Sequence, residues 1–144
     1  MNKLITVVIF FFSLSTFGQI ETNWLELRDV HYKSQYNEKY DSYFQVPFFG
    51  KKIEELANKE VKITGYMLTL APDAGVYVLS QNPYADCFFC GYGGPETAIE
   101  LVLKPGHDEF LMDELVTVTG TFQLNYDDIM SGVYKIIDAV AIKE

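Results

Sequence analysis

Residues 115–124, which read Leu-Val-Thr-Val-Thr-Gly-Thr-Phe-Gln-Leu, decide the fold class of this chain. Apolar side chains at Val116, Val118 and Phe122 alternate with polar side chains on either side of them. This two-residue period is typical of a β-strand that turns one face to a core. Gly120 lies in the middle, where glycine weakens a strand unless the backbone bends sharply or approaches another segment closely. The stretch therefore predicts a long, bent strand.

Four other segments have a similar β-strand character: residues 61–70, 75–80, 98–103 and 134–142. Gly65 interrupts the first of them as Gly120 interrupts the strand above, and closure of a small barrel creates the need for such bends. We therefore expect a mainly β fold, a five-stranded OB-like barrel. A β-sandwich is the alternative, but it needs additional strands that only the N-terminal segment could supply. Residues 106–113 are long enough for the short helix that OB barrels place between the third and fourth strands.

The segment before the barrel, residues 19–60, is predicted to be an N-terminal extension of the same single domain, residues 19–144. Residues 24–32 predict an extended strand. Tyrosines at positions 32, 36, 40 and 43 follow at spacings close to a helical turn, which indicates an aromatic-rich loop or short helix packed over one end of the core. Residues 51–59 predict one short helix or turn.

The first eighteen residues have the pattern of a secretory signal peptide. Lys3 precedes the apolar run from Leu4 to Phe12, and small and polar residues follow up to a cleavage point after Gly18 or Gln19. The apolar run is shorter than the roughly 20 residues that a membrane-spanning helix needs. We therefore expect residues 1–18 to be removed, and a periplasmic or secreted mature protein without a membrane span.

The chain is acidic, with twenty Asp and Glu against eleven Lys and Arg and a net charge of -9. Loss of Lys3 with the signal peptide changes this to about -10. Nucleic-acid affinity depends mainly on Lys and Arg contacts to phosphate, so this charge argues against a nucleic-acid partner. Cationic or neutral proteins, small molecules and metal ions remain as partners.

The chain contains only two cysteines, and they lie three positions apart in the stretch Cys-Phe-Phe-Cys-Gly, residues 87–91. In an exported protein, a disulfide between Cys87 and Cys90 is the plainest structural interpretation, because the compartment is oxidising. Such a bond would make the loop of residues 81–96 rigid. A purely structural envelope domain is the function that this interpretation implies.

A metal site is the second interpretation, because Cys-x-x-Cys-Gly forms one half of a zinc or iron knuckle. Two further ligands are needed. We take Glu96 and His107 as the candidates to join Cys87 and Cys90. Further candidate ligands are Asp86, His31 and the same loop of a second chain in a homodimer.

Thiol–disulfide exchange is the third interpretation, and the flanking residues disfavour it. A redox Cys-x-x-Cys usually opens a helix, whose N-terminus lowers the thiol pKa. The glycines and proline at residues 91–95 break any helix within one turn, and no βαβ pattern surrounds the motif.

Other catalytic patterns are missing from the sequence. It contains neither a Gly-x-Ser-x-Gly elbow nor a His-Glu-x-x-His pair, and it has only two histidines. The pair Asp127-Asp128, before Ser131-Gly132, most simply indicates a hairpin turn between the fourth and fifth strands. We therefore expect a protein without a catalytic site.

Ligands of OB barrels usually bind on the face of strands two and three, and the cysteine loop connects these two strands. Aromatic side chains gather around the loop and form the predicted ligand-binding set: Tyr77, Tyr84, Phe88, Phe89 and Tyr92. A large exposed apolar set is unusual, so we expect it to pack under the loop or to be covered by a partner. The hypothesis is an exported, non-enzymatic protein that binds a metal ion or a partner through this loop.

Several segments together resemble an uncharacterised family of exported envelope proteins from Bacteroidetes-like bacteria. They are Gly50-Lys51-Lys52, residues 61–67, Tyr77-Val78-Leu79-Ser80, Pro83-Tyr84, and above all Cys87-Phe88-Phe89-Cys90-Gly91. The resemblance implies an OB-like core and export, and no established activity. Some similar proteins are linked to metal uptake, which favours a metal role.

Overall fold

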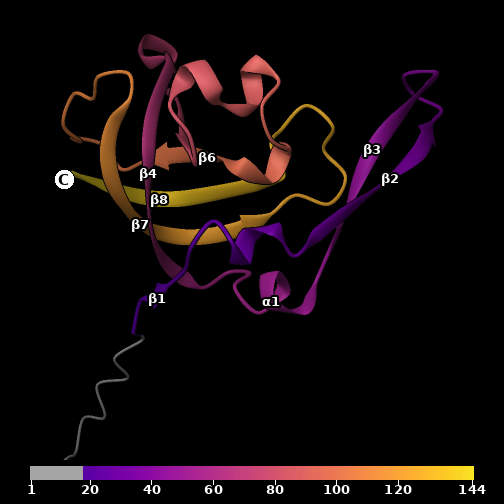
Figure 1. The fold of residues 1–144 in the computed structure, drawn as a ribbon, viewed down its shortest axis with the longest axis horizontal. Coiled ribbons are helices and arrows are strands. Elements are labelled where there is room, and N and C mark those ends of the chain that lie inside the picture. Colours follow the sequence, from indigo (N-terminus) through magenta and orange to yellow (C-terminus); the bar gives the residue numbers. More distant parts are fainter. Residues whose placement is uncertain (1–17) are drawn as a thin grey trace, which may run out of the picture.

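Five strands close into a barrel in the computed structural model, which describes residues 18–144 (Figure 1). These strands are β4 (Glu60–Ala71), β5 (Val76–Ser80), β6 (Ala98–Leu103), β7 (Glu114–Leu124) and β8 (Tyr134–Lys143). They pair in the order β4-β5-β6-β8-β7, and β7 pairs back onto β4. The β6–β8 pair is parallel and the other pairs of the barrel are antiparallel. This is the strand order of an OB barrel, as the sequence predicted.

Glycine allows the barrel strands to approach one another closely. A Cβ atom on Gly120 would lie 2.6 Å from Cγ2 of Ile136 and 2.7 Å from the carbonyl oxygen of Ile137. A Cβ atom on Gly65 would lie 2.7 Å from the carbonyl oxygen of Ser80. Backbone atoms cannot retreat from such contacts cheaply, so both positions require glycine, which confirms the role expected from the sequence.

The barrel interior is filled by the inward side chains of all five strands, and Tyr134 is the largest of those that are fully buried. Its hydroxyl donates a 2.7 Å hydrogen bond to the carbonyl oxygen of Leu27, in the short 3-10 helix η1 (Glu26–Arg28). Burial, and then the nearby negative charge of Glu96, raises the pKa of Tyr134. This hydrogen bond connects the N-terminal segment to the centre of the barrel.

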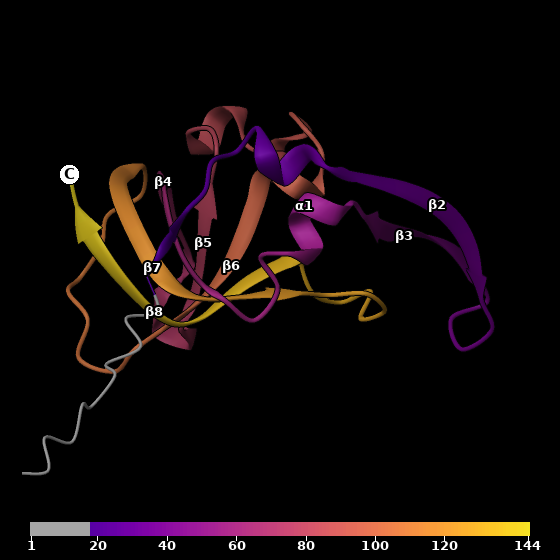
Figure 2. The same ribbon diagram turned by 90° about the horizontal axis from the view of Figure 1, so that it is seen from below.

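The N-terminal region differs from its prediction, because its aromatic residues form a β-hairpin. β2 (Val30–Asn37) and β3 (Ser42–Phe49) pair with each other and project from the barrel, and we call this hairpin the arm (Figures 1 and 2). Tyr36 and Tyr43 are cross-strand partners, with ring centroids 5.3 Å apart. The spacing that resembled a helical turn therefore comes from two strands that face each other across a turn.

Shorter elements complete the fold. β1 (Ile20–Glu21) pairs in parallel with β4, and α1 (Lys51–Glu54) connects the arm to the barrel. The 3-10 helices are η1 (Glu26–Arg28), η2 (Pro72–Ala74), η3 (Tyr84–Asp86), η4 (Phe88–Cys90) and η5 (Pro95–Thr97). The strand expected over residues 24–32 begins only at Val30, because η1 occupies the residues before it.

The helix predicted within residues 106–113 is wrong, because this connection is irregular, with a turn at each end. Gly106 has a left-handed φ of 80°, and the backbone N–H of Leu111 donates to the Glu114 carboxylate at 2.7 Å instead of to a preceding carbonyl. Phe110 is buried and anchors the connection to the core. Within residues 18–144, no helix is long and apolar enough to cross a membrane. The predicted signal peptide lies, apart from Gly18, outside the described residues.

We predict that Gly120→Ala lowers the free energy of unfolding by about 1–3 kcal/mol, because the new methyl group would press on Ile136 and on the backbone of Ile137. Urea unfolding followed by tryptophan fluorescence measures the change. Thr119→Ala, one residue earlier in the same strand, adds no atoms and is the matched control. An unchanged midpoint for Gly120→Ala would contradict the close approach.

Candidate functional site

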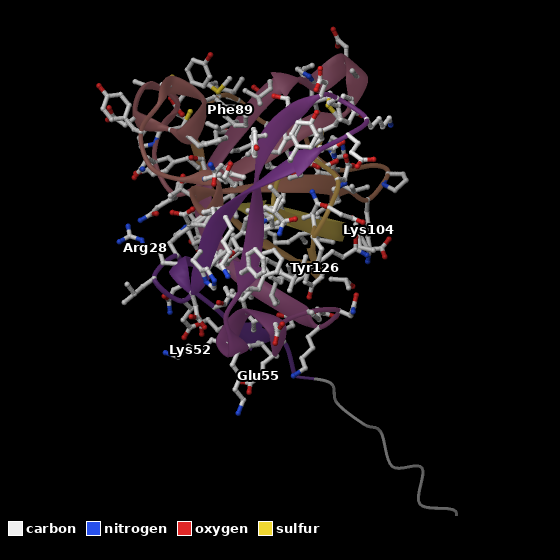
Figure 3. The ribbon with its side chains drawn as sticks, turned by 90° about the vertical axis from the view of Figure 1, so that its right-hand side faces the viewer. Arg28, Lys52, Glu55, Phe89, Lys104 and Tyr126 are labelled. Carbon is white, nitrogen blue, oxygen red and sulfur yellow. The ribbon has the colours of Figure 1, made fainter. Side chains whose placement is uncertain are left out.

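A groove of about 600 Å³ lies between the barrel and the arm. It is lined by β5 and β6, by β3 of the arm, by part of the cysteine loop, and by the connection between β7 and β8, which we call the β7–β8 loop (residues 125–133). Volumes of this size are typical of small-molecule and cofactor sites. Viewed from the arm's side, the arm crosses in front of the barrel, with Phe89 on one side of it and Tyr126 on the other (Figure 3).

The floor of the groove is the outer face of the barrel, and it is apolar. Val76 and Val78 of β5 and Val102 of β6 line it. The intervening residues of β5, Tyr77 and Leu79, point into the core. β5 therefore carries apolar side chains on both faces, whereas the outer face of a small barrel is normally polar.

The cysteine loop covers one end of this outer face. Cys87 is only 1% exposed and packs with Leu68, Val78 and Ala98, while Phe88 lies against the same cluster. This second, smaller core lies outside the barrel. It leaves the other end of the face open, because Val76 is 43% exposed and Val102 is 51% exposed.

The β7–β8 loop forms the acidic side of the groove. Asn125 organises it, because the amide Nδ2 donates to the carbonyl oxygens of Asp128 at 2.7 Å, Ser131 at 3.2 Å and Gly132 at 3.1 Å. Hydrogen bonds from the backbone N–H of Met130 and then from the hydroxyl of Ser131 hold the pKa of Asp128 below its ordinary value. This carboxylate therefore keeps its charge in mildly acidic solution.

The arm closes the groove on the remaining side. Four consecutive residues of β3, Phe44 to Pro47, line the groove, whereas β2 contributes Tyr32 alone. The Tyr32 hydroxyl donates to the Glu96 carboxylate at 3.1 Å. Burial, followed by the charge of Glu96, raises the pKa of Tyr32 well above its usual value. This contact fixes the base of the arm to the cysteine loop.

The predicted ligand-binding residues divide into two groups. Phe88 and Phe89 line the groove, and so does Tyr77, although its side chain points into the barrel core; Tyr84 and Tyr92 lie exposed outside the groove. The groove also includes residues of the arm and of the β7–β8 loop that were not predicted from the sequence, among them Phe44, Tyr126, Ile129 and Met130. The sequence does contain a signal for the β7–β8 loop: Tyr126, Ile129 and Met130 lie in the same turn as two aspartates. A turn that is fully solvated rarely contains three large apolar residues, so their presence indicates a contact surface.

The predicted metal-ligand set is not assembled. Within residues 18–144, no group of three or more His, Cys, Asp or Glu side chains is placed to hold a metal ion. Glu96 instead accepts the hydrogen bond of Tyr32, and the His107 ring packs against Tyr77 and Phe110, with centroids 5.3 and 6.1 Å away. His31 lies on the arm, stacked on Phe48. A site shared by two chains stays a prediction.

The structure contains both cysteines as free thiols, so the predicted disulfide is not formed in it. The exposed thiol of Cys90 donates to the carbonyl oxygen of Tyr84 at 3.0 Å. Partial desolvation, a hydrogen bond with Cys87 and the negative charge of Asp86 raise the pKa of Cys90. A thiol active in disulfide exchange needs a lowered pKa, so these surroundings argue against the redox interpretation.

The fold is similar to that of a DUF3299 family protein from Pseudomonas aeruginosa PAO1, known from a crystal structure. The TM-score is 0.54 and the sequence identity 15%, over 88% of this chain and 98% of that chain. No family model and no curated protein matches the sequence. At this identity the likeness shows the fold alone, and the predicted relation to exported proteins of Bacteroidetes-like bacteria stays a prediction.

We predict that iodoacetamide modifies Cys90 in the folded protein and Cys87 only after unfolding, because Cys87 is buried. The rate for Cys90 should increase with pH through a midpoint above the roughly 8.5 of a free cysteine, since the thiolate is the reactive form. Peptide mass spectrometry measures both sites. Protein isolated without reductant that resists modification and is two mass units lighter would instead contain the disulfide.

Proposed function

We propose that this chain is an exported, non-enzymatic binding protein and that its ligand occupies the groove. The observation that carries the proposal is the convergence of large apolar side chains, all between 37% and 79% exposed, on one cavity. They are Leu70, Val76, Phe89, Val102, Tyr126 and Met130. Exposed apolar side chains that are grouped in this way are typical of an interaction site.

The chemistry of the lining favours a partner with apolar side chains over a metal ion. Aromatic and aliphatic residues make up most of the groove, and its charged residues are Glu100, Asp127, Asp128 and Lys135. Lys135 pairs with Glu100 at 3.2 Å, so the lining has an excess of negative charge from Asp127 and Asp128, part of which the charges of Lys135 and Lys39 offset at Asp128. Such a surface suits a neutral or cationic ligand that buries apolar groups.

The carboxylates of the groove are poorly suited to acid–base catalysis, which supports a non-enzymatic role. A catalytic acid or base needs a pKa near the working pH. The pKa of Asp128 is lowered instead, and Glu100 lies in an ion pair. Neither histidine, His31 nor His107, lines the groove.

Export and the closer family relation belong to the same proposal. The charged and apolar pattern of residues 1–18 supports export. The Cys-Phe-Phe-Cys-Gly loop supports a relation to exported proteins of Bacteroidetes-like bacteria. Expression in a bacterial host followed by N-terminal sequencing of the periplasmic or secreted protein should find a chain that begins at residue 19 or 20. A chain that retains Met1 would contradict export by this route.

We predict that the neutral dye Nile red binds the groove with a blue-shifted, enhanced emission, and that Val76→Lys and Val102→Lys each weaken this binding about tenfold. A buried valine contributes about 1.5–3 kcal/mol, and 1.4 kcal/mol corresponds to tenfold. Ile142→Lys, at an exposed position of β8 outside the groove, is the matched control and should change little. If dye binding weakened equally in all three variants, or in none of them, the groove would not be the ligand site.

A further inference from the structure

We propose that the ligand is an extended segment of a partner protein, which adds as a strand to the free edge of β3 and places a Lys or Arg side chain against Asp127 and Asp128. This inference depends on the proposed function and names the class of ligand. It combines an unpaired strand edge, an apolar floor beside it and an excess of negative charge in one groove.

The edge of β3 is free within residues 18–144. β3 pairs only with β2, in a sheet of two strands. In an antiparallel pair, every second residue directs its N–H and C=O groups away from the partner strand. Pro47 has no N–H and cannot donate to a new strand, so on this edge the donors available before it are alternate residues of β3. Unpaired edges of this kind are templates for another strand.

The free edge, rather than a face of the arm, borders the groove. Alternate residues of a strand lie on opposite faces of its sheet, so a groove against one face would be lined by every second residue of both strands. The groove is instead lined by four consecutive residues, Phe44 to Pro47, and by a single residue of β2. At about 3.3 Å per residue, this edge accommodates roughly four residues of an added strand.

The floor provides contacts for the side chains of such a strand. Side chains of an extended peptide alternate in direction, and those that point toward the barrel would meet Val76, Val102 and Phe89. Main-chain hydrogen bonds to the edge would supply affinity, and these apolar contacts would supply selectivity. The binding segment should therefore alternate apolar residues with polar ones.

The charge of the groove selects a basic segment and disfavours a second copy of this chain as occupant. Three carboxylates and one ammonium group line the groove, so its net charge is two negative. Two such grooves brought together would repel each other, whereas one Lys or Arg would be attracted. Asp127 is exposed on the rim, within reach of an incoming side chain.

A displayed library of random octapeptides, selected on the wild-type protein and counter-selected on Val102→Lys, tests the inference. We expect selected peptides to alternate apolar and polar residues and to contain a Lys or Arg. The best peptide is then synthesised with backbone N-methyl groups on its odd or on its even residues. Since an added strand uses the N–H groups of alternate residues, one methylated form should bind at least tenfold weaker while the other should bind much like the parent.

Charge recognition is tested with Asp127→Asn against the peptide and against its Lys→Glu or Arg→Glu version. We expect several-fold weaker binding of the basic peptide to the variant, and no such loss for the acidic version, which binds weakly to both proteins. Asp127 is preferred to Asp128 because Asp128 holds the loop through Met130 and Ser131. Asp73→Asn, in η2 outside the groove lining, is the matched control.

The outcomes separate this inference from the proposed function. If Nile red binds the groove but no octapeptide is selected, or if both methylated peptides bind equally, strand addition is wrong and the binding groove stands. If neither the dye nor a peptide binds in a groove-dependent way, the proposed function fails as well. A concentration-dependent dimer that blocks the dye would show that a second copy is the occupant, which would overturn the inference.

Discussion

Closure of the barrel by β4 and β7 is the constraint on which the rest of the molecule depends. These strands pair from Glu60↔Thr121 to Met67↔Glu114, and without this ladder both would present long unpaired edges. The close approach of strands at Gly65 and Gly120 keeps the ring small enough for side chains to fill its interior. Because the interior is complete, the apolar residues on the outside of β5 and β6 are not needed for the barrel core and are available for another purpose.

The apolar residues on the outer face of β5 and β6 fall into two groups. At one end, Cys87 and Phe88 cover Leu68, Val78 and Ala98, so Cys87 acts as a small apolar side chain in a second core. At the other end, Val76 and Val102 remain open to the groove. In the function proposed above, the cysteine loop is a structural cover that forms one wall of the groove, whereas the sequence placed the binding site on the loop itself.

The barrel could be predicted from the alternation of residues 115–124 and from the glycines within long strands. Both are local signals, because the alternation shows that one face of the strand is buried and the glycine shows that the strand bends. The arm was not predicted, since Tyr36 and Tyr43 meet across a turn and their spacing in sequence resembles that of a helix. The groove could be placed on strands two and three by the habit of OB barrels. Its other walls, Phe44 to Pro47 and Tyr126 to Met130, come from distant segments, and no local pattern states that they face each other.

The unpaired edge of the arm favours self-association, and the negative charge of the chain opposes it. An exposed edge beside an apolar floor invites pairing with other copies, and proteins usually cover or interrupt such edges. Here Pro47 interrupts one end of β3, while the net charge of -9 makes copies repel one another. Asp127 and Asp128 concentrate that repulsion at the groove itself. In the proposed binding mode, the two carboxylates that attract a basic segment also repel a second copy of the chain, so partner selection and protection from self-association would have a single electrostatic origin.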